Sequence, residues 1–86
     1  MRVVIFGAEP KVAPIATALR ARGNSVFVRP EPSISLVHIL HPRAVVLVGE
    51  GAIFDAFEWA LRRLGGAPTL MRVRAEEEAP LALLGA

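Results

Sequence analysis

The run Val3-Val4-Ile5-Phe6 is the feature that most restricts how this chain can fold. A strand that is apolar on both faces belongs inside a sheet covered by helices on both sides, and such sheets are typically parallel. The run Ala44–Val48 has the same character. We therefore expect these two strands at the centre of a covered parallel sheet, where ligands and catalytic groups gather at the carboxyl ends of the strands.

Extended and helical segments alternate along the whole chain. Strands are predicted at Val3–Phe6, Ser25–Arg29, Ala44–Val48 and Thr69–Arg74, and helices at Lys11–Arg22, from Ser33 to near His41, at Ile53–Leu64 and from Glu76 to near Leu84. Because Pro14 fits only near a first turn, we expect the first helix to start late or to be distorted. Short loops imply right-handed crossovers and helices on both faces of the sheet.

The outer strands are recognised by their mixed faces. In the fourth strand Arg72 and Arg74 fall on one face, which marks an edge because charged side chains there discourage open-ended pairing. The prediction is one α/β domain over residues 1–86, a small three-layer sandwich with a four-stranded parallel sheet in the order 2-1-3-4.

Composition narrows the class of protein. The chain has 10 Lys+Arg against 8 Asp+Glu, and this near balance argues against nucleic acid as the main partner. The absence of cysteine excludes disulfides, thiol catalysis and cysteine-ligated zinc. Since there is neither a charged leader before an apolar segment nor an apolar run near ~18 residues, we expect a cytoplasmic protein without a membrane partner.

A series of short motifs links these elements to a known family. The motifs are Glu9-Pro10 after the first strand, Ala18-Leu19-Arg20-Ala21-Arg22-Gly23 before the second, Pro42 ahead of Val45-Val46-Leu47, Asp55-Ala56-Phe57-Glu58 followed by Leu61-Arg62-Arg63-Leu64, and Pro68 opening the fourth strand. Over nearly the whole chain this order resembles the receiver domain of two-component response regulators. The resemblance implies a flavodoxin-like fold and a role in regulation.

The residues that carry receiver chemistry are missing at the matching positions. The resemblance places the acidic pair that holds magnesium at Gly7 and Ala8, and the phospho-accepting aspartate at Val48, seven residues before Asp55. Valine and arginine stand where a hydroxyl residue would end the fourth strand, and the family's fifth strand with its lysine cannot be matched. Aspartyl phosphorylation needs a carboxylate nucleophile, and magnesium needs hard oxygen ligands. We therefore expect a degenerate, truncated receiver-like domain that is no enzyme, holds no cofactor or metal, and acts as an interaction or dimerisation module.

Trp59 is the candidate anchor of such an interaction. On a helical wheel the apolar face of the third helix centres on Phe57 and Leu61, and Trp59 points nearly the opposite way. Such a side chain either lies over neighbouring arginine stems or anchors an interface. We expect a homodimer, or docking of a regulatory protein, with the outer surface of this helix preferred over the fourth-strand edge. The candidate interface residues are Trp59, Arg62, Arg63, Arg72 and Arg74.

A second class of function remains open, that of a small-ligand, nucleotide or anion binder using the loops after the first and third strands. Its candidate residues are Gly7, Glu9, Gly49, Glu50, Gly51 and Asp55. This hypothesis predicts a concave pocket at the carboxyl ends of those two strands. The glycines lack the spacing of a dinucleotide fingerprint. The carboxylates either hold a divalent cation or simply favour the first turns of the helices that follow.

Overall fold

A computed structural model describes residues 1–64 and 68–73. Its strands are β1 (Arg2–Gly7), β2 (Ser25–Arg29), β3 (Ala44–Val48) and β4 (Thr69–Val73), and its helices are α1 (Glu9–Ala21), α2 (Ile34–Leu40) and α3 (Ala52–Arg62). The strands pair in parallel in the order β2-β1-β3-β4, which confirms the predicted sheet. Arg74 and the helix predicted from Glu76 lie outside the described residues. Among the described helices, none is long and apolar enough to cross a membrane.

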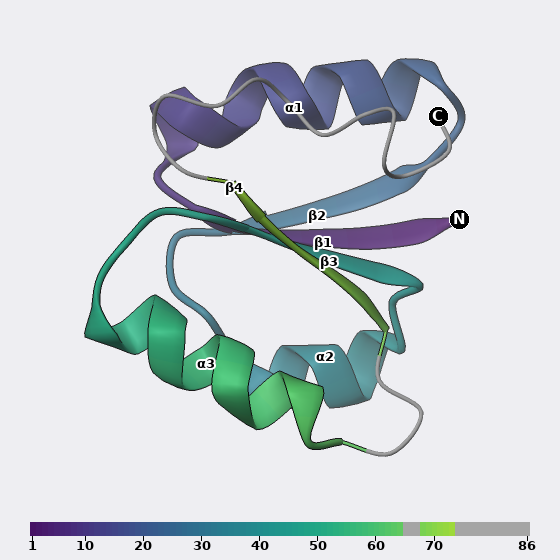
Figure 1. Ribbon diagram of the computed structural model, residues 1–86. Coiled ribbons are helices and arrows are strands. Elements are labelled where there is room, and N and C mark those ends of the chain that lie inside the picture. Colours follow the sequence, from purple (N-terminus) through teal and green to yellow (C-terminus); the bar gives the residue numbers. More distant parts are fainter. Residues whose placement is uncertain (65–67, 74–86) are drawn as a thin grey trace.

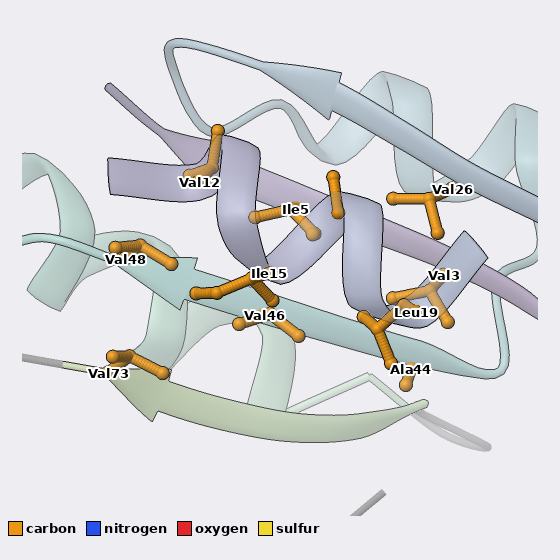
Figure 2. Packing of buried hydrophobic residues seen from close by; sticks show 11 residues of the cluster. Val3, Ile5, Val12, Ile15, Leu19, Val26, Ala44, Val46, Val48 and Val73 are labelled. Carbon is orange, nitrogen blue, oxygen red and sulfur yellow. The ribbon is translucent and has the colours of Figure 1, made fainter. Parts of the chain in front are cut away.

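The sheet separates two apolar cores. Helix α1 lies on one face, while α2 and α3 cover the other (Figure 1). On the first face, Ile15 and Leu19 of α1 point toward alternate residues of the strands, as Figure 2 shows. On the second face, Phe57 of α3 packs edge-on against Phe6, with ring centroids 5.2 Å apart. All of β3 and most of β1 are buried, as their two-sided apolar sequences predict.

Helix α1 begins earlier than the sequence indicated. The prediction of a start at Lys11 was wrong, because the helix begins at Glu9 and continues through Pro14. Pro10 suits the first turn, where its fixed φ is helical and its missing N–H would have had no partner in the helix. Pro14 costs one hydrogen bond on the exposed side of the helix. Burial of the opposite face against the sheet compensates for that loss.

The ends of α2 follow from local chemistry. The Ser33 hydroxyl caps the first turn by accepting a hydrogen bond from the Leu36 N–H at 3.2 Å. At the other end His41 adopts a left-handed backbone with φ of 47°, and its N–H donates to the Val37 carbonyl. The helix therefore stops just before Pro42, close to the predicted boundary.

Candidate functional site

The carboxyl ends of β1, β3 and β4 lie in register and end in apolar residues. Gly7 is the partner of Val48, and Val48 is the partner of Val73. The two valines are only 4 % and 3 % exposed and belong to the same core cluster as Val12 of α1. Figure 2 shows them at the ends of neighbouring strands. The positions that the receiver resemblance assigns to the phospho-acceptor and the hydroxyl residue are therefore filled by packed aliphatic side chains.

Gly7 brings β1, β3 and α1 close together. A Cβ atom at this position would lie 2.5 Å from the Val48 carbonyl oxygen and 2.9 Å from Cγ1 of Val12. Real Cβ atoms do not approach a backbone oxygen that closely, so any side chain at position 7 requires the backbone to shift. An acidic residue in place of Gly7 does not fit this arrangement.

Arg72 of β4 joins three elements at the same end of the sheet. Its Nε donates to the Gly49 carbonyl at 3.0 Å, and its Nη1 donates to Asp55 Oδ1 and Glu58 Oε1, each at 2.9 Å. The side chain is 16 % exposed. Its guanidinium therefore fixes the β3–α3 loop and the first half of α3 against β4. Its positive charge is paired with the two carboxylates.

The electrostatics of this network keep its members charged. Hydrogen bonds from Arg72 and then Arg62 lower the pKa of the Glu58 carboxyl, although partial burial opposes the shift. Burial works to lower the pKa of Arg72, but hydrogen bonds to Glu58 and Asp55 outweigh it and raise the pKa. A carboxylate with a lowered pKa is a poor proton donor or acceptor at neutral pH. The network is suited to holding elements together rather than to acid–base catalysis.

The loops after β1 and β3 lie in different local surroundings. A depression of about 420 Å³ touches Gly7 and Glu9, but it lies between α1 and β2 and does not include Gly49–Gly51. The pocket predicted at the ends of the first and third strands is not found in this depression. Beside β3, the Phe54 ring packs against Gly49, where a Cβ would lie 3.1 Å from it, and Arg72 donates to the Gly49 carbonyl.

The carboxylates of the candidate cation site are those of Glu9, Glu50 and Asp55. Asp55, one of its three carboxylates, binds Arg72. Over the part of the chain that the structure describes, no group of three His, Cys, Asp or Glu side chains is placed to hold a metal ion. Glu9 lies in the first turn of α1 and Asp55 in the first turn of α3, where the helix dipole favours a carboxylate.

The outer face of α3, defined by Trp59, Arg62 and Arg63, brings three of the candidate interface residues together. Trp59 is 61 % exposed, as the helical wheel predicts. The guanidinium carbon of Arg63 lies 3.9 Å from the centroid of the indole, so the aromatic ring does lie against an arginine. Arg62 pairs with Glu58 at 3.0 Å. The same Glu58 carboxylate also binds Arg72, so Arg62 adjoins the network described above, and Arg74 falls outside the described residues.

Sequence reasoning missed Glu58 as a partner of Arg72. A signal existed, because Glu58 follows Asp55 by three residues and so shares its side of the helix. What periodicity does not reveal is which neighbouring strand that side meets. The structure shows that it meets β4, through Arg72.

The site thus consists of three parts. They are the apolar strand-end cluster of Gly7, Val48 and Val73, the hydrogen-bond network of Arg72, and the outer face of α3 with its exposed Trp59. Comparison with protein-family models, curated proteins and solved structures finds no match to this chain.

Proposed function

We propose that this chain is a non-catalytic, receiver-like module that works in regulation through protein contacts and forms a homodimer. The observation that carries the proposal is the filling of the strand ends at Gly7, Val48 and Val73. Two of these residues are buried valines, and they supply neither a nucleophile nor an oxygen ligand. The exposed groups that favour binding lie instead on the outer face of α3.

In this proposal the outer face of α3 receives a regulatory protein. Tryptophan and arginine are the side chains most often responsible for binding energy at protein interfaces. The stacking of Arg63 on Trp59 holds both side chains in place before any partner arrives. Less rotamer freedom is then lost on binding, which favours association.

Exposure to acetyl phosphate and magnesium, followed by intact-mass measurement, tests the non-catalytic proposal. We expect no gain in mass, because Val48 offers no carboxylate for phosphorylation. A phosphorylatable receiver domain in the same reaction is the positive control. A magnesium-dependent, hydroxylamine-labile gain of one phosphate would overturn the proposal.

The depression between α1 and β2 favours a second candidate function, the binding of a small ligand, nucleotide or anion. Glu9, Thr17 and Arg20 supply polar groups around a largely aliphatic lining. A thermal-shift panel of nucleotides, inorganic phosphate and divalent cations separates the two functions. A ligand at 100 times its Kd adds about 2.7 kcal/mol of stability. A shift of that size would support the binder, and its absence across the panel would support the interaction module.

A further inference from the structure

The two edges of the sheet differ in how their backbone groups are occupied. On β2 the Val26 carbonyl accepts a hydrogen bond from Arg20 and the Val28 carbonyl accepts one from Arg29, both at 2.8 Å. The Ser25 N–H, by contrast, donates toward β1 at the Met1 carbonyl. Outward carbonyls that the chain's own arginines already occupy are not available to an incoming strand. The β2 edge is therefore guarded against further pairing.

On β4 the outward groups can be identified from the ladder. The Thr69 N–H donates to the Arg43 carbonyl at 3.1 Å, and the Val73 carbonyl accepts from the Gly49 N–H at 3.2 Å. Both residues thus direct their backbone groups toward β3. Because these groups alternate in direction along a strand, the N–H and C=O of Leu70 and Arg72 point away from β3. Within residues 1–64 and 68–73, no group hydrogen-bonds to them on that side.

The Arg72 side chain does not guard this edge as Arg29 guards β2. It is turned onto Gly49, Asp55 and Glu58 instead. Two carboxylates balance its charge, so a second Arg72 nearby would meet a neutralised group rather than a bare cation. The charge that would discourage strand pairing is thereby offset.

From this difference we propose that two copies of the chain join through their β4 edges as antiparallel strands, with a twofold axis at Met71. The inference rests on the homodimer of the proposed function and places its interface at the fourth-strand edge, in place of the outer surface of the third helix that the sequence favoured. Leu70 and Arg72, whose backbone groups point outward, lie symmetrically on either side of Met71. The edge can therefore pair with a second copy of itself. Leu70 of each copy then faces Arg72 of the other, and each such pair exchanges both of its N–H···O bonds. Met71 lies opposite the same residue of the second copy, at a site without hydrogen bonds, where side chains approach most closely.

This pairing closes the assembly at two copies. The joined sheet would have the order β2-β1-β3-β4-β4-β3-β1-β2. Its outermost strands are the two β2 edges, whose outward carbonyls Arg20 and Arg29 already occupy. A twofold interface of this kind uses the same surface on both copies and leaves no free β4 edge for a third.

The seam also leaves Trp59 and Arg63 of the outer face of α3 exposed, whereas Arg62 lies on the side of α3 nearer β4. The side of α3 that lies next to β4 is marked by Glu58, which binds Arg72. Trp59 instead points away from the sheet and is exposed beside Arg63. Docking through Trp59 and Arg63 can therefore fail without loss of the β4 seam, and the seam can fail without loss of docking.

Cysteine cross-linking tests the seam directly, because the chain has no native cysteine. Opposed residues at such a site have Cα atoms about 4.5 Å apart, within the range of a disulfide. Under mild oxidation Met71→Cys should become mostly covalent dimer on a non-reducing gel. Thr69→Cys is the matched control. It lies on the same face, but in the proposed dimer residue 69 of one copy lies about 13 Å along the strands from residue 69 of the other copy. Equal cross-linking of the two variants, or none in Met71→Cys, would overturn the proposal.

A second pair of variants tests the backbone hydrogen bonds themselves. Leu70→Pro removes an outward N–H and leaves the hydrogen bonds between β4 and β3 intact. An edge strand tolerates proline at a position whose N–H points outward. Leu70→Ala, the matched control, also removes the leucine side chain but keeps the N–H. We expect association of the proline variant to be weaker by about tenfold or more than that of the alanine variant. Equal dissociation constants for the two folded variants, checked by far-UV circular dichroism, would contradict a backbone seam.

The outcomes separate this inference from the proposed function. A wild-type chain that stays monomeric at high micromolar concentration would overturn the β4 seam and the homodimer. It would leave the non-catalytic character, which the acetyl phosphate experiment tests, unaffected. Should Leu70→Pro fail to fold, cross-linking of Met71→Cys alone decides the question.

Discussion

Of the glycines that the structure describes, Gly7 leaves the least room for a side chain. Its missing side chain allows the Val48 carbonyl and Val12 to approach, and this close approach closes the strand-end cluster. The same contact explains why an acidic residue at position 7 is incompatible with the observed packing. The lack of an acidic side chain at position 7 is thus a consequence of core packing.

Substitution of Gly7 by alanine should destabilise the protein. The added Cβ would meet the Val48 carbonyl oxygen at 2.5 Å, so the strands must shift. Overpacking of this kind costs about 1–3 kcal/mol in the free energy of unfolding. Urea denaturation of wild type and Gly7→Ala measures the difference. A variant as stable as wild type would show that β1 and β3 do not approach as closely as described.

The Glu58 carboxylate should make a pH-dependent contribution to stability. Its pKa in the folded state is lowered by hydrogen bonds from Arg72 and Arg62, below its ordinary value of 4.5. The ionised form therefore stabilises the fold above that value, and the contribution is lost as the pH falls through the folded-state pKa. At pH 7, Glu58→Gln should cost about 1 kcal/mol.

Chemical denaturation between pH 7 and pH 3 tests this contribution. The difference in unfolding free energy between wild type and Glu58→Gln should decrease as the pH is lowered. Glu31 is exposed in the loop between β2 and α2, so Glu31→Gln serves as the control for the loss of one charge. A gap that stays constant down to pH 3 would mean that Glu58 does not act through its charge.

At the scale of elements, the strands were more predictable than the helix boundaries. Two-sided apolar runs identified β1 and β3 as central, and the mixed faces of β2 and β4 identified the edges. The start of α1 was missed because Glu9-Pro10 was placed in the loop after the first strand and Pro14 was expected to delay or distort the helix. Tertiary burial of the opposite face of α1 outweighed that local signal.

The candidate site was less predictable because it depends on which elements become neighbours. Periodicity placed Trp59 on the exposed side of α3 correctly. It could not show that Asp55 and Glu58 would meet Arg72, since this contact requires the helix to cross β4 at one particular offset. Nor could it show that Phe54 would occupy the space beside Gly49.

The Ser33 cap gives a prediction for one element. Its hydroxyl satisfies the Leu36 N–H, and replacing such a cap by alanine costs about 1 kcal/mol. Ser33→Ala should therefore lower the unfolding free energy, whereas Ser35→Ala, at an exposed position within α2, should leave it nearly unchanged or raise it slightly. Thermal unfolding of the two variants makes the comparison. Equal effects would show that the cap does not contribute to stability.

At the scale of the whole molecule, the structure combines a closed strand-end cluster with two different edges and one exposed aromatic face. Over the described residues one sheet edge is guarded and the other is not, and in our proposal a small domain of this kind gains burial and backbone hydrogen bonds by pairing with itself. The outer face of α3 then stays available on both copies. In this account the sheet provides assembly, and the helix provides recognition.

The most direct test follows the state of association and the accessibility of Trp59 together. Trp59 is the chain's single tryptophan, so fluorescence quenching by acrylamide reports on the outer face of α3 alone. We expect sedimentation velocity to show a dimer at high micromolar concentration, with the quenching of Trp59 unchanged between monomer and dimer. A wild-type chain that remains monomeric, or a dimer in which Trp59 becomes protected from acrylamide, would contradict the account.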